Sequence, residues 1–261
     1  MSENSLIDNI KIPGEIVRLP SLGLFYDNGE LDDTVQNGEV MVYPMSAFDE
    51  IAMRNIDNII NGTSITDVFT RCIPQILKPA ELFGKDVDQL LLILRRITYG
   101  PMIDVIYKHT CKDAKDHKYS IDITEVINST RSIDPTTITA LYSVILENGQ
   151  LVELRPIRFK DIVTIMQNSK DFSNTPLYEI QQKLVESTIN IIHAVDGTTD
   201  KDKIKAWAAK IPAPWFKKIS NALDVGNNWG PDSNHTITCI DCQQIMTVEI
   251  PLNPLTFFLD Y

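Results

Sequence analysis

The sequence has few of the residues that mark fibrous, linker-like or disulfide-stapled proteins. Its 261 residues include 11 Gly, 14 Pro and four Cys, which excludes collagen-like, low-complexity and disulfide-dense chains. No apolar run approaches the roughly 18 residues that a membrane-spanning helix needs. Residues 1–15 lack the basic start and continuous apolar stretch of a secretory signal, so we expect synthesis without export by that route.

Basic residues are also under-represented. There are 24 Lys and Arg against 35 Asp and Glu, and the formal charge is -11. Such a charge repels phosphate backbones, so it gives no support to a nucleic-acid binder and makes basic protein partners easier to accommodate. Residues 1–50 hold ten of the acids and only two bases. This acidic segment is either a solvated loop, which we favour, or a docking surface.

Recognisable catalytic motifs are missing as well. The spacing of the polar residues yields no Ser/His/Asp arrangement, glycine-rich phosphate loop, HExxH helix or paired-carboxylate pocket. We therefore expect a protein that is not an enzyme, without a small-molecule substrate.

Hydrophobic residues make up 43% of the chain, and their spacing predicts a helix-rich α+β fold. Ser46 and Asp49 resemble a capping box at the start of a helix. Asn148-Gly149 between apolar runs predicts a β-hairpin. Strands are expected near 16–19, 39–43, 102–107, 119–123, 137–146, 151–154 and on both sides of 239–242, and helices at 48–60, 64–73, 86–99, 159–167, 176–195, 202–210 and 214–225.

The chain also shows an internal similarity. Residues 37–45 and 148–157 align as a turn, a strand and a proline, and a helix that begins with Phe48 or Phe159 follows each. Helices and then a cysteine-containing hairpin come after both. We interpret this as two tandem halves, 1–127 and 128–261, each with a β-hairpin, a helical segment and a cysteine-tipped β-hairpin. Chance matching of short segments is the alternative.

The cysteines suggest a metal site. Cys239 and Cys242 have the CxxC spacing of a zinc knuckle between two strands, and a closed zinc site needs four ligands. Cys111 on the other hairpin supplies a third, and His109, His117 or His235 supplies the fourth, with His109 our choice. Buried thiols without metal are an equal alternative, and a redox pair is a weaker one. Cys72 is expected to be a core thiol.

Several of these segments resemble the T4-type phage baseplate hub proteins, a family of hub subunits and hub assembly chaperones. The resemblance rests on the strand entering Tyr43-Pro44-Met45, the run 97–100 (Ile-Thr-Tyr-Gly), the closing strand 120–123 and the terminal CxxC at 239–242 with the ending 249–258 that follows it. It covers roughly 15–165 and 236–258. It implies that the two cysteine hairpins together resemble a split zinc ribbon, although the first keeps Cys111 alone.

The resemblance further implies a non-enzymatic structural or assembly protein that binds other baseplate proteins. Such a chain is made in the host cytoplasm and is found in the virion tail if it is retained there. Possible contacts are the acidic segment, exposed strand edges and the apolar tail 255–259. The alternative is a zinc-ribbon regulator that binds nucleic acid, but residues 234–251 contain no Lys or Arg.

Overall fold

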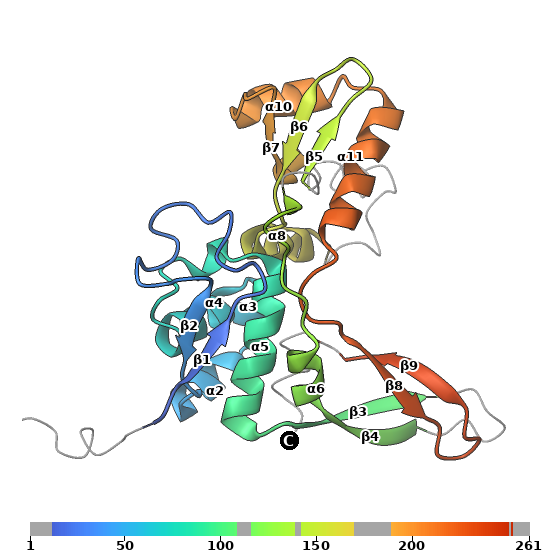
Figure 1. The fold of residues 1–261 in the computed structure, drawn as a ribbon. Coiled ribbons are helices and arrows are strands. Elements are labelled where there is room, and N and C mark those ends of the chain that lie inside the picture. The colour runs from blue at the N-terminus through green and yellow to red at the C-terminus, as the bar shows by residue number, and fades with distance from the viewer. Residues whose placement is uncertain (1–11, 109–115, 139–141, 170–188, 251, 253–261) are drawn as a thin grey trace, which may run out of the picture.

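The computed structural model describes residues 12–108, 116–138, 142–169, 189–250 and 252. Figure 1 shows a first lobe on the left, a second lobe at the top and a pair of β-ribbons that extends to the lower right. Within the described residues, no helix is long and apolar enough to cross a membrane. The sheets are small and antiparallel and lie among helices, which confirms the mixed helix-and-strand class.

The first lobe begins with a two-stranded sheet that buries Val17 of β1 and alternate residues of β2, Val40 and Val42. Val17 and Val40 face the core, while Ile16 on the other face is 64% exposed. Helices follow the hairpin, and the longest of them is buried along its central part, where residues 90–94 are each at most 2% exposed. The elements are β1 (Glu15–Arg18), β2 (Glu39–Val42), α2 (Ala47–Met53), α3 (Ile56–Ile60), α4 (Thr63–Cys72), η1 (Pro79–Glu81) and α5 (Gly84–Tyr99).

Two antiparallel ribbons form the lower part of the molecule. They are β3 (Met102–Lys108) with β4 (Asp116–Asp122), and β8 (Asn234–Thr238) with β9 (Ile245–Glu249). The short helix α6 (Ile123–Asn128) follows the first ribbon. The buried side chains of β8 and β9 belong to the same hydrophobic core as those of α5, so the C-terminal ribbon shares the core of the first lobe.

The second lobe is built on a three-stranded antiparallel sheet in the order β5-β6-β7. Its strands are β5 (Ser143–Ile145), β6 (Leu151–Leu154) and β7 (Ile192–Val195), and its helices are α10 (Lys201–Ala208) and α11 (Ala213–Gly226). The Asn-Gly hairpin is confirmed, because Gly149 has φ +87° in the turn between β5 and β6. The helix α8 (Phe159–Ser169) packs on the first lobe, against η1, α3 and α5.

Two predicted helices differ from the structure. The expected helix 48–60 is two helices, because the Asn55 side chain accepts a hydrogen bond from the Asn58 N–H and starts α3 anew. Residues 192–195 of the expected helix 176–195 form β7, in which β-branched Ile192 and Val195 pair with β6. Residues 176–188 of that prediction lie outside the described residues.

The order of hairpin, helices and ribbon occurs in both parts of the chain, with β7 as an added strand in the second. The predicted boundary between 127 and 128 falls at the end of α6. A common origin of the two halves stays a prediction.

Candidate functional site

The site is the junction between the lobes, and the N-terminal loop (residues 19–38) builds one side of it. The loop is closed at its base by the hydrogen bond from the Leu19 N–H to the Gly38 carbonyl, at 2.8 Å. Gly38 has φ +71°, and a Cβ there would lie 2.7 Å from the Leu22 carbonyl carbon, so only glycine fits. The loop can therefore return tightly to β2.

A buried carboxylate fixes this loop to α5. Asp86 is 0% exposed, and it accepts hydrogen bonds from the Ser21 N–H at 2.9 Å and the Tyr26 hydroxyl at 2.7 Å. The Tyr26 hydroxyl in turn accepts from the Phe83 N–H at 2.9 Å. Burial raises the pKa of Asp86 to about 6, although its hydrogen bonds from Ser21 and Tyr26 act in the opposite direction.

Tyr26 links the two hydrophobic cores. Its ring packs against both of them and lies 4.6 Å, centroid to centroid, from the ring of Phe83. Burial, followed by the nearby Asp86 carboxylate, raises the pKa of the Tyr26 phenol well above its ordinary value. The N-terminal loop is therefore anchored in the core through Tyr26, while residues 27–29 and 33–34 of the same loop are exposed.

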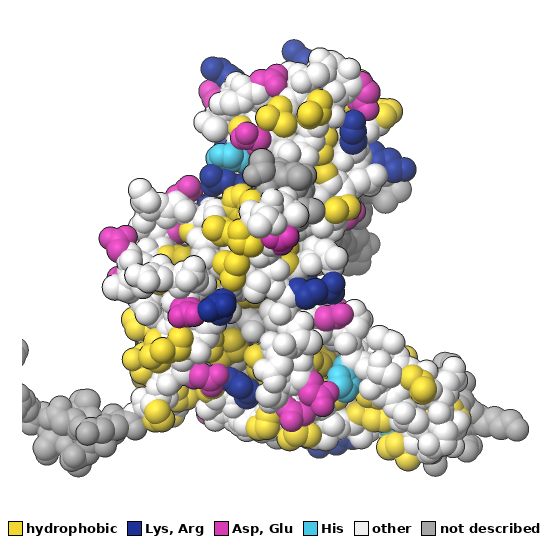
Figure 2. All heavy atoms as spheres, in the orientation of Figure 1, with side chains coloured by type: hydrophobic (Ala, Val, Ile, Leu, Met, Phe, Trp, Pro, Cys, Tyr) yellow, Lys and Arg dark blue, Asp and Glu magenta, His cyan; other side chains and the backbone are white. Residues whose placement is uncertain are grey.

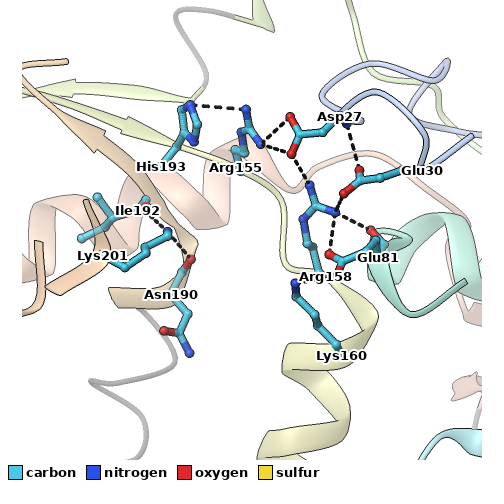
Figure 3. Close-up of polar contacts among 10 residues, drawn as sticks. All are labelled: Asp27, Glu30, Glu81, Arg155, Arg158, Lys160, Asn190, Ile192, His193 and Lys201. Carbon is cyan, nitrogen blue, oxygen red and sulfur yellow. Dashed lines mark hydrogen bonds and ion pairs between the residues drawn. The ribbon is translucent and has the colours of Figure 1, made fainter. Parts of the chain in front are cut away.

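Beyond Tyr26 the same loop forms an ionic clamp with the second part of the chain. Arg158 Nη1 donates to Glu30 Oε1 at 2.7 Å and to Glu81 Oε2 at 2.8 Å (Figure 3). The Arg158 and Glu30 side chains are only 12% and 8% exposed. Lys160 Nζ binds the other Glu81 oxygen at 2.7 Å. We call these four residues the Arg158 clamp.

Arg155 extends this network toward β7 and α10. Its guanidinium lies 3.4 Å from an Asp27 carboxylate oxygen and donates to His193 Nε2 at 3.3 Å (Figure 3). Burial, together with the charges of Arg155 and Lys201, lowers the pKa of His193, so its neutral form is favoured. His193 was expected on a helix and instead lies on β7.

The acidic segment is largely used within the chain. Six of its carboxylates form ion pairs with Arg residues: Glu15 with Arg96, Asp27 with Arg155 and Arg158, Glu30 with Arg158, Glu39 with Arg18, Asp49 with Arg71, and Glu50 with Arg54. Glu15, Asp27 and Glu39 remain 47%, 62% and 46% exposed despite these pairs. Whether the exposed part of the segment is only a solvated loop or also a docking surface stays a prediction.

The predicted zinc ligands are only partly described. Cys239 is 0% exposed and lies in the core, whereas Cys242 is exposed, and a tight turn joins them. Cys111 and His109 lie outside the described residues. Among the residues that the structure describes, no group of three or more His, Cys, Asp and Glu side chains could hold a metal. Cys72 is buried as predicted, and this burial raises the pKa of its thiol to about 12.

The two cysteine-bearing ribbons do lie against each other. His117 Nε2 on β4 is 2.6 Å from an Asp241 carboxylate oxygen in the turn between β8 and β9. Val105 and Tyr119 of the first ribbon pack on the core to which Cys239 and Met246 of the second belong. The structure therefore brings together the parts of the ribbons that it describes.

An apolar surface lies on the first lobe, away from the junction. Its most exposed members are Phe48 at 79%, Ile51 at 69% and Ile16 at 64%. Ile16 pairs with Met41 on the outer face of the β1–β2 sheet, and Tyr43 continues that face. Figure 2 shows hydrophobic side chains gathered over β1, β2 and α2. We call Ile16, Tyr43, Phe48 and Ile51 the apolar patch.

The sequence did not identify Asp86, Tyr26, Arg155 or Arg158 as site residues. One pattern does indicate the Arg residues: at 155–160 three basic residues follow a strand in an otherwise acidic chain, and their charge is opposite to that of the N-terminal loop. The contact between segments about 130 residues apart depends on the fold, and no local pattern encodes it.

The family comparison covers most of the molecule. The model of a family described as T4 bacteriophage base plate protein matches residues 49–258. No curated protein and no solved structure matches the chain significantly. The match begins within α2 and ends beyond β9, so it includes the second lobe, the ribbon pair and most of the helical part of the first lobe, but not β1, β2 or the N-terminal loop.

Proposed function

Because the chain belongs to the family of T4 bacteriophage base plate proteins, we propose that it is a non-enzymatic protein of the baseplate hub that works by binding its neighbours. A hub subunit and a hub assembly chaperone both fit this proposal. The family itself establishes only the coarser statement, a structural protein of the phage baseplate. The resemblance of the terminal CxxC and the ending 249–258 to hub proteins supports the finer statement, a role in the hub.

The observation that carries the proposal is the apolar patch. Exposed Phe and Ile side chains that gather on one surface are typical of sites where another protein binds. Burying each of them on a partner contributes roughly 1.5 to 3 kcal/mol. Phe48 and Ile51 are three residues apart on α2, so they share one face of the helix. They can enter a partner's surface together.

The proposal is tested by co-purification of other baseplate proteins with the tagged chain. We expect Phe48→Glu with Ile51→Glu to abolish their recovery while the melting temperature stays unchanged. A matched control replaces Ile145 and Val225 with Glu, since these are 64% and 63% exposed on the second lobe. Equal loss in both variants, or no loss in either, contradicts the patch as the binding surface.

Mass spectrometry of dissociated mature particles separates the two roles. A subunit is recovered from particles in a fixed ratio to the other baseplate proteins. A chaperone is recovered from assembly intermediates and is missing from particles.

We also propose one structural zinc ion bound by Cys111, Cys239, Cys242 and His109. The tight turn supports it: the Cys239 N–H donates to the Gln244 carbonyl and the Gln243 N–H to the Cys239 carbonyl, and Gln243 has φ +60°. Such a turn can present both thiolates of a CxxC to one ion. Metal analysis tests it: about one zinc per chain, lost in Cys242→Ser and kept in Cys72→Ser, is expected. Purified chain without zinc contradicts it.

A further inference from the structure

The junction contains an open pocket whose charge is opposite to that of the whole chain. Its volume is about 520 Å³, in the range of ligand pockets. Six cationic side chains and His193 line it, against four carboxylates: Lys78, Arg155, Arg158, Lys160, Lys201 and Lys205, and Asp27, Glu30, Glu81 and Asp161. The lining therefore carries a formal charge of about +2, while the chain carries -11. Figure 2 shows Lys, Arg and His side chains in the notch between the lobes.

The two walls of this pocket differ in how their cations are neutralised. On the wall next to the first lobe, Arg155, Arg158 and Lys160 bind carboxylates of the chain itself. On the opposite wall, β7 and α10 present His193, Lys201 and Lys205, and the structure gives none of these three an ion pair with a described carboxylate. Lys201 Nζ instead donates to the Asn190 and Ile192 carbonyls, at 3.1 and 2.5 Å.

The cations of the pocket also disfavour one another. Partial burial lowers the pKa of Lys201, and the charges of Arg155, Arg158 and Lys160 add to this effect, although Asp161 opposes it. Arg155 and Lys201 similarly lower the pKa of His193. An anionic group in the pocket relieves this repulsion.

We propose that this pocket binds carboxylate side chains from an acidic segment of a protein partner. The proposal rests on the proposed function only for the identity of that partner, a neighbouring baseplate protein. Lys201 and Lys205 are four residues apart on α10, so they lie on one face of the helix and can receive successive acidic side chains.

The chemistry of the lining favours carboxylates over phosphate. The same pocket already binds the carboxylates of Asp27, Glu30 and Glu81. Phosphate sites commonly use bidentate guanidinium groups or convergent backbone N–H groups. Both guanidinium groups of this lining are engaged by carboxylates. The cations that have no ion pair with a described carboxylate are all lysines, Lys78 before η1 and Lys201 and Lys205 on α10.

The test measures binding of a fluorescein-labelled peptide of alternating Glu and Ala by fluorescence anisotropy, with the full chain at low salt. The pocket variant is Lys78→Glu with Lys205→Glu, since both side chains are exposed and neither forms an ion pair with a described residue. The control, Lys210→Glu with Lys217→Glu, changes the net charge equally outside the pocket. We expect the dissociation constant to rise at least about tenfold in the pocket variant and to change less than about twofold in the control.

Equal weakening in both variants shows general charge attraction and overturns the proposal, as does a wild-type chain that does not bind the peptide. Displacement of the peptide by an equal concentration of inorganic pyrophosphate overturns the choice of carboxylate. None of these results affects co-purification through the apolar patch, so failure of this proposal is distinguishable from failure of the proposed function.

Discussion

The N-terminal loop makes two anchoring contacts that solve the same problem by different physical means. At Asp86 a fully buried carboxyl receives a hydrogen bond from Tyr26 and one from the Ser21 N–H, and none of the described cations forms an ion pair with it. The second contact uses Glu30, four residues after Tyr26 in the loop. There the partly buried guanidinium of Arg158 binds carboxylates from two segments. The first contact depends on burial and the second on charge.

The two contacts show how an acidic segment can stabilise the fold. Its charges at the junction are compensated by basic residues beyond residue 150, while its Tyr26 packs against both hydrophobic cores. Breaking a buried hydrogen-bonded network lowers stability strongly, whereas an ion pair contributes less to stability the more exposed it is. The predictions below follow that order.

The largest loss of stability is expected from Tyr26→Phe. The change removes the donor to Asp86 and leaves the Phe83 N–H without its acceptor, so we expect the free energy of unfolding to fall by about 3 kcal/mol in urea titrations at pH 7. The control is Tyr43→Phe, at an exposed ring, for which we expect a change below about 0.5 kcal/mol. Similar effects of the two variants would contradict a stabilising role of the buried Tyr26 hydroxyl.

The buried anchor also predicts a characteristic pH dependence. Because the pKa of Asp86 rises from 3.8 to about 6 on folding, its contribution is complete below pH 3.8 and is lost as the pH rises through 6. The stability of the wild type relative to Asp86→Asn should therefore fall between pH 4 and 6, by at most roughly 1.4 kcal/mol per pH unit.

Asp49 gives the opposite sign and serves as the control. Burial alone would raise its pKa, but hydrogen bonds from Ser46 and the Arg71 guanidinium lower it overall. Its contribution is therefore present above its ordinary pKa and is lost as the pH falls. The same slope for Asp49→Asn and Asp86→Asn would contradict the assignment.

The next largest loss of stability is expected when the Arg158 clamp is broken. Arg158→Met leaves Glu30 and Glu81 without their shared partner, and we expect a loss of about 2 kcal/mol because the group is only 12% exposed. Lys160→Met removes a 49%-exposed partner of Glu81 and should cost less than about 0.5 kcal/mol. Thermal unfolding of both variants checks this ranking, and a reversed order refutes it.

The smallest effect is expected at the exposed pair of Arg18 and Glu39. Both side chains are about half exposed and lie 2.5 Å apart. We expect Glu39→Gln to change the free energy of unfolding by less than about 0.5 kcal/mol, and the difference to vanish in 0.5 M salt, where the Debye length is only about 4 Å. A larger, salt-independent change would show that exposed members of the acidic segment are also structural.

Local patterns predicted most of the fold. The capping box at Ser46 and Asp49, the Asn148-Gly149 hairpin and the apolar run of α5 each depend on neighbouring residues, and each is confirmed. The helix predicted at 192–195 was wrong. A short apolar run with β-branched residues fits a helix or a strand equally, and pairing with the edge of β6 makes it a strand. Asn55 likewise fits the interior of a helix as well as its N-cap, so the sequence predicts one helix where the structure has α2 and α3.

The junction could not be predicted in the same way. Asp86 looks like an ordinary first-turn acid of a helix, and its burial follows only from the loop that folds over it. Arg158 meets Glu30 across 128 residues of sequence. The sequence therefore does not predict these contacts of the acidic segment, whereas the resemblance to the baseplate family rests on local motifs at 43–45, 97–100, 120–123 and 249–258.

The claim that this baseplate protein acts through the apolar patch is tested most directly by counting complete baseplates in the electron microscope, in lysates of phage that carry Phe48→Glu with Ile51→Glu. The account predicts that complete baseplates are lost while the variant chain accumulates folded, for a subunit and for a chaperone alike. Complete baseplates in wild-type numbers would contradict it.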